Sequence, residues 1–530
     1  MTASSEQNWE KIAASKRAAL AAQIPLEYRI PQQLLPPDDQ LDVTTFPKES
    51  GWFDQKELEI AESSATHILN KIASRSWTSE EVTRAFLKHA AAAQQLTNCL
   101  TDFFPTEALA IAKSLDQHLR KTGKLVGPLH GLPISLKDNF NIVGKDSTVG
   151  FASLVNQPAT CNATLVELLG GLGAVRYCKT NVPTAMMIPE SVNNVFGRTV
   201  NPRNRKLTSG GSSGGESALI AFGGSVLGVG TDIGGSLRIP AACTGQEAVM
   251  SVNGPMAKSL EDITYYSKAV VDAQPWLIDP KCLPIPWRPA ERKSKLKIAV
   301  LWNDGIVQPT PPVTRALKET VEKLQAAGHE VVGAWDPVQH LKAVELLARM
   351  FVADGGKSVR KLLAPTDEPW RPEMRSYSEA SELGTYEMWQ LHLQRSELQK
   401  DYLEQWMSYG GLDAILAPTC PYATVAHGDF DYVGYTGVYN VVDYSVVSFP
   451  SGVTVDKNQD RPSNHERLSE ICEDVHAKYN PEEIDGMPVS LQLVAKRLEE
   501  EKVLVMTEMV LQAIHPSTLS SITSKIKAKI

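Results

Sequence analysis

The sequence predicts an α/β fold with a mostly parallel sheet, and two segments support this. Between 127 and 255, short apolar runs alternate with glycines, and a helical pattern at 164–173 separates predicted strands at 132–137 and 174–180. The same strand–helix–strand order recurs at 297–335. Such alternation places neighbouring strands in the same direction, which is typical of a parallel sheet.

Length and composition favour one large globular domain with additions. The 530 residues exceed one ordinary core, but large α/β enzymes can keep a single sheet with insertions. The chain is 42% hydrophobic and 22% charged, as soluble globular proteins are. Its net charge of −8 is spread along the sequence, so we expect no basic face for nucleic acid or anionic lipid.

Cysteine usage and the N-terminus suggest a cytoplasmic protein. The seven cysteines are far apart and form no Cys-x-x-Cys pair, so we expect free thiols: Cys99, Cys161, Cys178, Cys243, Cys282, Cys420 and Cys472. The first 20 residues are charged and lack the apolar core of a signal peptide. No stretch approaches the roughly 18 apolar residues of a membrane span, so no integral membrane segment is expected.

A helical layer is predicted for residues 1–104, before the main α/β domain at 105–530. Apolar residues recur at helical spacing in three segments, 7–23, 56–73 and 78–96. The last begins with Thr78 and Glu81 at capping-box spacing. Between the first two, the proline-bearing segment 25–40 predicts an extended linker.

The second half of the chain continues the α/β pattern and carries an insertion. A predicted helix at 313–328 ends at Gly328, and further strands are predicted at 413–418 and 488–495. Segment 340–408 is rich in helix formers and ends in a long amphipathic stretch. We expect this segment to be a helical insertion packed over the sheet.

Segment 206–240 contains two Gly-Gly-Ser steps, at 210–212 and 234–236, which could be simple turns. The segment lacks the Gly-Lys-Ser/Thr ending of a phosphate loop. Ser212 and Ser213 formally fit G-x-S-x-G, but a nucleophile elbow follows an apolar strand, and the preceding NPRNRKLT is polar. The eleven histidines offer no recognisable context for a Ser-His-Asp triad.

A third interpretation combines these serines with Lys137, at the end of the apolar segment GLPISLK. A lysine is a base only when neutral, so its pKa must fall from about 10.4 by roughly 3 units, about 4 kcal/mol. Burial away from a carboxylate could supply this, although the adjacent Asp138 argues against it and an exposed lysine is the ordinary alternative. Consecutive glycines turn backbone amides toward one point, so Ser236, which follows such a pair, is the better nucleophile and Ser212 the better relay.

Several motifs together resemble the amidase signature hydrolases, and most closely their fungal acetamidase-like branch. They include GPLHGLPISLKDNF, NNVFGRTVNP, GGSSGGESALIA, GVGTDIGGSLRIPA and GPMAKSLEDI within residues 127–265, and GMPVSLQLVAKRLEEEKVL near the end. The resemblance implies a large mixed, mostly parallel central sheet with helices on both faces. It also implies a Ser, cis-Ser, Lys triad: Ser236 as nucleophile, Ser212 after a cis peptide bond, and Lys137 as base.

The resemblance implies further site residues. The oxyanion hole falls on the backbone amides of Ile233, Gly234, Gly235 and Ser236. Met186 corresponds to a backbone contact near the acyl pocket, and Asp232 and Arg238 correspond to a structural pair that supports the loop. Two segments are candidates for the acyl pocket: the helical insertion and the tyrosine-rich segment 430–450. The rings of the second segment could equally belong to the core: Tyr432, Tyr435, Tyr439 and Tyr444.

The predicted function is hydrolysis of a small-molecule carboxylic amide to an acid and ammonia or an amine, through an acyl-enzyme. Neither a metal nor an organic cofactor is expected, and a homodimer is possible. An esterase or aryl acylamidase with the same triad, or the glutamine-amidase subunit of an amidotransferase, stays as an alternative. The physiological amide is not predicted.

Overall fold

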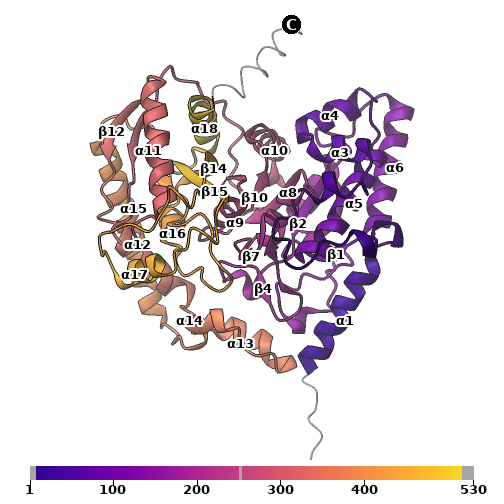
Figure 1. The fold of residues 1–530 in the computed structure, drawn as a ribbon, viewed down its shortest axis with the longest axis horizontal. Coiled ribbons are helices and arrows are strands. Elements are labelled where there is room, and N and C mark those ends of the chain that lie inside the picture. Colours follow the sequence, from indigo (N-terminus) through magenta and orange to yellow (C-terminus); the bar gives the residue numbers. More distant parts are fainter. Residues whose placement is uncertain (1–7, 250–252, 516–530) are drawn as a thin grey trace, which may run out of the picture.

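The computed structural model describes residues 8–249 and 253–515, and its centre is one large twisted sheet (Figure 1). Within the described residues the sheet has eleven strands, in the order β1-β3-β2-β8-β10-β9-β14-β15-β13-β11-β12. The strands are β1 Leu100–Phe103, β2 Pro133–Lys137, β3 Val175–Thr180, β8 Leu227–Thr231, β9 Glu247–Val249, β10 Asn253–Ala257, β11 Lys297–Val300, β12 Glu330–Ala334, β13 Ala414–Pro418, β14 Ser445–Thr454 and β15 Pro488–Ala495. Two small two-stranded sheets consist of β4 Val192–Asn193 with β5 Gly197–Arg198, and β6 Val200–Asn201 with β7 Asn204–Thr208.

The sheet is mixed, as predicted, but it is not mostly parallel. Among the described strands, four neighbouring pairs are parallel and six are antiparallel. The predicted strand–helix–strand units do give parallel pairs, β2 with β3 and β11 with β12. The central strands β9 and β10 follow one another with a connection too short for a crossover helix, so they pair antiparallel.

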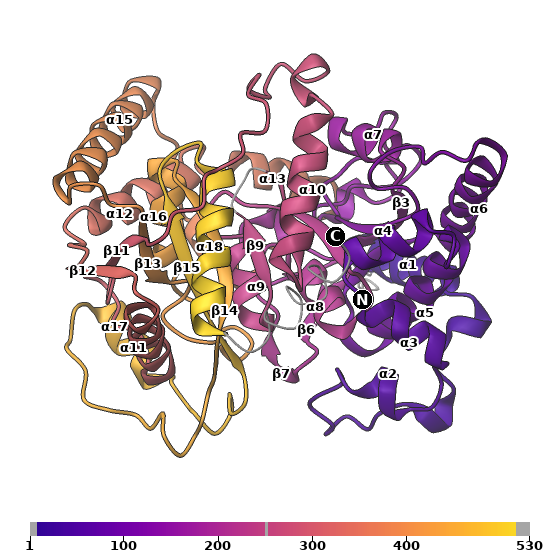
Figure 2. The same cartoon turned by 90° about the horizontal axis from the view of Figure 1, so that it is seen from above.

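Helices cover both faces of the sheet, as Figure 2 shows for the half around β11 to β15. Along β11, Ile298 and Val300 face one core with α11 and α18, whereas Ala299 faces a second core with α12, α15 and α16. The helices after β1 and before the insertion are α6 Pro105–Thr122, α7 Thr164–Gly171, α8 Gly214–Phe222, α9 Arg238–Thr244, α10 Leu260–Asp272 and α11 Pro311–Ala326. Those after the insertion are α16 Gly434–Val442, α17 Glu470–Ala477 and α18 Glu500–Ile514.

The N-terminal helices pack over the end of the sheet that contains β1, β3 and β2 and contribute to two cores. They are α1 Asn8–Gln23, α2 Phe46–Glu49, α3 Gln55–Glu62, α4 Ala65–Ala73 and α5 Ser79–Thr97. Helices α1, α2 and α5 share one core with Tyr177, and α4 shares another with Ile134. Thr78 and Glu81 form the predicted capping box. The pattern at 56–73 is divided into α3 and α4 because the Ser64 side chain accepts the His67 N–H and starts a new helix.

The linker at 25–40 is less extended than predicted, because it contains two 3-10 turns, Leu26–Tyr28 and Gln32–Leu34. The predicted insertion is helical, with α12 His340–Phe351, α13 Lys357–Leu363, α14 Arg375–Ser378 and α15 Thr385–Ser408. Gly328 follows α11 with a φ of +88°, as a helix-terminating glycine does.

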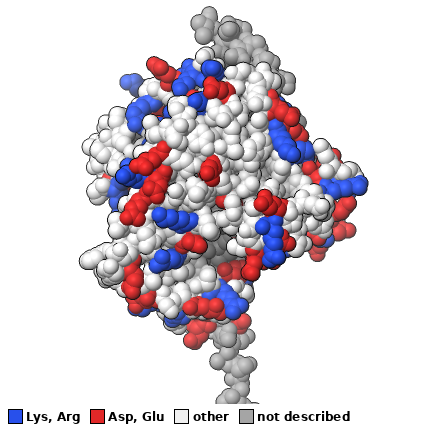
Figure 3. Space-filling model, turned by 90° about the vertical axis from the view of Figure 1, so that its left-hand side faces the viewer, with Lys and Arg blue, Asp and Glu red and all other residues white. Residues whose placement is uncertain are grey.

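The distribution of charged side chains and the state of the cysteines agree with what the sequence predicts. On the face drawn in Figure 3, Lys and Arg side chains lie among Asp and Glu side chains. All seven cysteines are free. Over residues 8–249 and 253–515, no helix is both long and apolar enough to cross a membrane.

Candidate active site

Lys137 is the last residue of β2 and its side chain is completely buried. Its Nζ donates to Ser212 Oγ at 2.6 Å and to Thr231 Oγ1 at 2.8 Å. Burial lowers the pKa of this amine to about 7, although the nearby carboxylates of Asp232 and Glu216 act in the opposite direction. Within the described part of the chain Lys137 forms no ion pair, so a large share of the amine is neutral near pH 7.

The adjacent carboxylate of Asp138 does not reach this amine. It accepts hydrogen bonds from Thr101 Oγ1 at 2.6 Å, Thr148 Oγ1 at 2.9 Å and the Val149 N–H at 2.7 Å. Its nearest cation is Lys179, at 3.9 Å. Because successive side chains along an extended segment point in opposite directions, adjacency in sequence does not produce an ion pair here.

Ser212 lies in the first Gly-Gly-Ser step, immediately before α8. Its peptide bond with Gly211 is cis, as the resemblance implies, and its side chain is buried. Gly211 permits a close approach, because a Cβ there would lie only 2.7 Å from the Ile188 carbonyl oxygen. The Ser212 hydroxyl is thereby held beside Lys137 in a tightly packed interior.

Ser236 lies in the second Gly-Gly-Ser step, between β8 and α9, and is partly exposed. The Ser213 N–H donates to the Ser236 carbonyl at 3.2 Å, which joins the two steps through the backbone. Among the described residues the Ser236 hydroxyl has no hydrogen-bond partner, so no direct bond to Ser212 Oγ is present. Hydrogen bonds of catalytic groups are often long in a free enzyme and tighten when substrate binds.

A buried ion pair shapes the loop that carries Ser236. Arg238 Nε lies 3.2 Å from Asp232 Oδ2, and both side chains are fully buried. Asp232 also accepts the N–H groups of Gly235 and Leu237, at 2.8 and 3.1 Å. The pair predicted from the sequence therefore fixes the loop backbone as well as neutralising charge.

The four backbone amides predicted for the oxyanion hole differ in whether their N–H group already has a hydrogen-bond acceptor. The Gly235 N–H is already used by Asp232, so it points away from a substrate. Within the described residues the N–H groups of Ile233, Gly234 and Ser236 donate to no acceptor. Three amides at this turn are therefore free to bind an anion.

A cavity of about 580 Å³ opens beside Ser236. Its wall includes Gly211, Ile233 and Gly234 from the glycine-rich segments, and Met186, which has a φ of +58°. The helical insertion contributes a second group of lining residues: Val344, Leu347, Ala348, Arg349, Phe351, Val352, Glu373, Ser376 and Tyr377. No histidine lines the cavity in the described part of the chain, so a Ser-His-Asp arrangement has no base here.

The tyrosine-rich segment divides between the core and the cavity. Its four tyrosines are buried in the core beside α12 and α15 and none lines the cavity: Tyr432, Tyr435, Tyr439 and Tyr444. Instead, Phe430, Asp431 and Val433 of the same segment reach the cavity wall. The core alternative for the tyrosines is therefore correct.

Sequence reasoning missed two polar side chains near Lys137. Thr231 Oγ1 accepts a hydrogen bond from Lys137 Nζ, and Thr231 directly precedes Asp232 in the motif GVGTDIGGSLRIPA. Glu216 is buried, accepts from Ser135 Oγ at 2.5 Å and Thr180 Oγ1 at 2.8 Å, and has a pKa raised to about 7 by burial. The sequence did contain a signal for Glu216, because a glutamate stands there within the otherwise apolar helix that follows the first Gly-Gly-Ser step.

Comparisons with known proteins identify the family of this chain. A family model described as "Amidase" matches residues 81–246 and 244–504. An acetamidase of Emericella nidulans is 41% identical, covering 95% of this chain and 97% of the relative, and an acetamidase of Aspergillus oryzae is 38% identical, covering 95% and 98%. A fatty acid amide hydrolase structure superimposes with a TM-score of 0.91 at 32% identity, covering 96% of this chain and 95% of that one.

These matches define the class of protein: the chain is an amide-cleaving hydrolase of α/β fold. The chain belongs to the amidase signature family. The predicted α/β amidase-signature fold and the prediction of an amidase are both confirmed.

Proposed function

We propose that this chain hydrolyses carboxylic amides through an acyl-enzyme on Ser236, with Ser212 and Lys137 as the proton carriers. The observation that carries the proposal is the 2.6 Å hydrogen bond between Lys137 Nζ and Ser212 Oγ, made by a buried amine without an ion pair among the described residues. Such an amine can take a proton near neutral pH.

In the first step, Ser236 Oγ forms a bond to the amide carbonyl carbon. Its proton passes to Ser212 Oγ, whose own proton passes to Lys137 Nζ. The carbonyl oxygen becomes an oxyanion, which the N–H groups of Ile233, Gly234 and Ser236 stabilise. This step requires the Ser236 hydroxyl to reach Ser212 when substrate is bound.

In the second step, the carbon–nitrogen bond breaks. The proton on Lys137 returns through Ser212 to the leaving nitrogen, which departs as ammonia or an amine. Water then attacks the acyl-enzyme, with its proton following the same route, and the carboxylic acid is released. The balance of atoms and protons is complete with the chain, the amide and water.

The cavity supports a mainly apolar acyl group larger than acetyl. Its volume of about 580 Å³ falls in the range of small-molecule sites, and Met186, Leu347 and Phe351 give it an apolar wall. Two relatives carry the name acetamidase and one similar structure is named a fatty acid amide hydrolase, so both short and long acyl groups belong in a substrate panel.

Ammonia release from primary amides of increasing acyl length tests the proposal. We expect Ser236→Ala to abolish turnover, and Ser212→Ala and Lys137→Ala to lower kcat/KM by about 100-fold or more. Ser213→Ala is the matched control, because the Ser213 hydroxyl is buried beside the site without a hydrogen-bond partner in the described structure. Full activity of Lys137→Ala would remove the lysine from the mechanism.

Matched esters of the same acyl groups separate an amidase from an esterase. An acyl-enzyme forms from either substrate, so the ratio of kcat/KM values for amide and ester measures the preference directly. We expect the purified chain to release ammonia from simple amides without a partner protein, which a glutamine-amidase subunit would require.

A further inference from the structure

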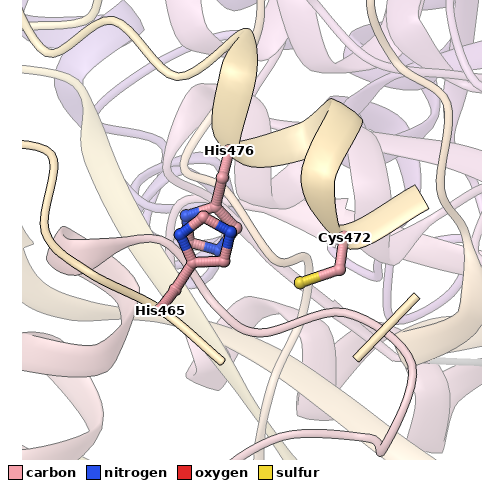
Figure 4. Close-up of side chains that lie close together, drawn as sticks. All are labelled: His465, Cys472 and His476. Atoms are coloured by element: carbon pink, nitrogen blue, oxygen red, sulfur yellow. The ribbon is translucent and has the colours of Figure 1, made fainter. Parts of the chain in front are cut away.

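Three side chains of types that can bind a metal ion lie close together in α17 and the segment before it. They are His465, Cys472 and His476, and their ligand atoms all lie within 4.8 Å of one another. Figure 4 shows the two imidazole rings stacked over each other with the cysteine sulfur directed toward them. None of the three lines the active-site cavity.

Helix geometry brings two of the three together. Cys472 and His476 are four residues apart on α17, which places their side chains on the same helix face. The Ser469 hydroxyl accepts the Cys472 N–H at 3.0 Å and fixes the first turn of this helix. The sulfur therefore lies near the N-terminal end of α17.

One residue orients both of these side chains through its backbone. The Gln308 N–H donates to Cys472 Sγ at 3.4 Å, and the Gln308 carbonyl oxygen lies 2.9 Å from His476 Nε2. Because a carbonyl oxygen can only accept, the proton of His476 is on Nε2 and the lone pair is on Nδ1. A histidine held by a backbone carbonyl through one nitrogen, with the other free, is the usual arrangement of a metal ligand.

His465 completes the cluster from the segment before α17. Its ring lies 3.7 Å from the His476 ring, centroid to centroid, and the planes differ by 10°. Its Nε2 is buried without a hydrogen bond in the described structure, and Glu473 Oε1 lies 3.3 Å away. Glu473 is not part of the cluster whose ligand atoms all lie within 4.8 Å of one another, so its carboxylate would have to move to become a fourth, oxygen ligand.

We propose that His465, Cys472 and His476 bind one zinc-like divalent cation, with Glu473 or water as the fourth ligand. Two imidazoles and one thiolate form a mixed nitrogen and sulfur set that suits Zn²⁺ in tetrahedral coordination. On binding, the thiol proton is released and the ligand atoms draw together. The cation would tie the segment around His465 to α17, which the backbone hydrogen bonds of Gln308 already join to a third segment.

Cobalt(II) titration of the purified, chelator-treated full chain tests this site. Co²⁺ substitutes for Zn²⁺, and a cobalt–thiolate bond gives a near-ultraviolet charge-transfer band. We expect the band to saturate at one Co²⁺ per chain and to be displaced by Zn²⁺. It should disappear in Cys472→Ser and weaken strongly in His465→Ala, whereas the exposed-thiol control Cys161→Ser should keep it.

The His465→Ala variant separates loss of the site from misfolding. The His465 ring is partly exposed, so its removal disturbs the fold less than a change at the buried Cys472. Amide hydrolysis by each variant reports whether the chain is folded, and we expect His465→Ala to retain it. No stoichiometric band, a band that survives Cys472→Ser, or loss of the band in Cys161→Ser would each overturn the proposal. Failure of this test would leave the Ser236 mechanism intact, because the two sites share no residue.

Discussion

Lys137 Nζ and Ser212 Oγ are 2.6 Å apart, and both side chains are almost completely removed from water. The amine would normally be charged, but burial lowers its pKa to about 7. Asp138 is adjacent to Lys137 in the sequence, and its carboxylate could have kept the amine charged. Instead, this carboxylate accepts hydrogen bonds from Thr101, Thr148 and Val149. The interior therefore contains a buried amine with the properties that the proposed base requires.

Amide hydrolysis should depend on pH through this amine. Because the folded-state pKa of Lys137 is about 7, the neutral base is lost as the pH falls through that value. We expect kcat to fall about tenfold per pH unit below pH 6 and to level off above pH 8. A stopped assay of ammonia release in constant-ionic-strength buffers measures the profile, and a rate that is flat down to pH 5 contradicts the assignment.

Removing the charge of Glu216 should move this profile. The Glu216 carboxylate raises the pKa of Lys137 against the effect of burial, so Glu216→Gln is expected to shift the midpoint to lower pH. Glu247→Gln is the control, since Glu247 is also a buried glutamate but is not among the groups that act on Lys137. An unchanged midpoint in Glu216→Gln, or an equal shift in both variants, would show that the two sites are not coupled.

Gly235 should tolerate no side chain. Its φ is +126°, and a Cβ would lie 2.2 Å from Thr436 Oγ1. We expect Gly235→Ala to lower the free energy of unfolding by about 1–3 kcal/mol and to reduce kcat/KM, since this loop carries Ser236. Denaturant unfolding with a parallel activity assay measures both effects.

Gly170→Ala provides the comparison, because Gly170 lies in α7 with open space around it. A helical alanine there should be neutral or stabilising by up to about 1 kcal/mol. If Gly235→Ala behaved like Gly170→Ala, the proposed tight fit of the loop would be wrong.

The helical insertion should determine acyl-chain length. Leu347 of α12 lines the cavity, so Leu347→Trp should fill part of it and raise KM for long-chain amides more than for short ones. Tyr439→Phe removes only a buried hydroxyl that lies outside the cavity and has no hydrogen-bond partner among the described residues, so it should leave the selectivity unchanged. Steady-state kinetics over the amide panel provide the comparison, and a uniform loss across all lengths would argue against a role in selectivity.

The sequence was most informative about features that are formed by residues close together in the chain. Thr78 and Glu81 form a capping box because the motif is completed within a single helical turn. The glycine pairs marked both serine loops, because only glycine permits those close approaches. The place of Lys137 at the end of an apolar strand was compatible with burial but equally with exposure, and only the resemblance indicated its role.

Features that depend on distant segments were not predictable from the pattern. The antiparallel centre of the sheet arises from β9, β10, β14 and β15, whose pairing is set by tertiary contacts rather than by local alternation. Likewise, the use of the Gly235 amide by Asp232 depends on the folded shape of the loop. The spacing of Cys472 and His476 is local, but the Gln308 backbone that orients them is 164 residues from Cys472 in the chain, so that contact could not be read from a local motif.

The most direct test of the central claim is to identify the acylated residue. Rapid acid quenching of the enzyme during turnover of a slowly deacylated amide, followed by proteolysis and mass spectrometry, locates the acyl group. We predict an adduct of the acyl mass on Ser236, absent from Ser236→Ala and formed far more slowly in Lys137→Ala. An adduct on any other residue, or rapid acylation of Lys137→Ala at neutral pH, would contradict the account.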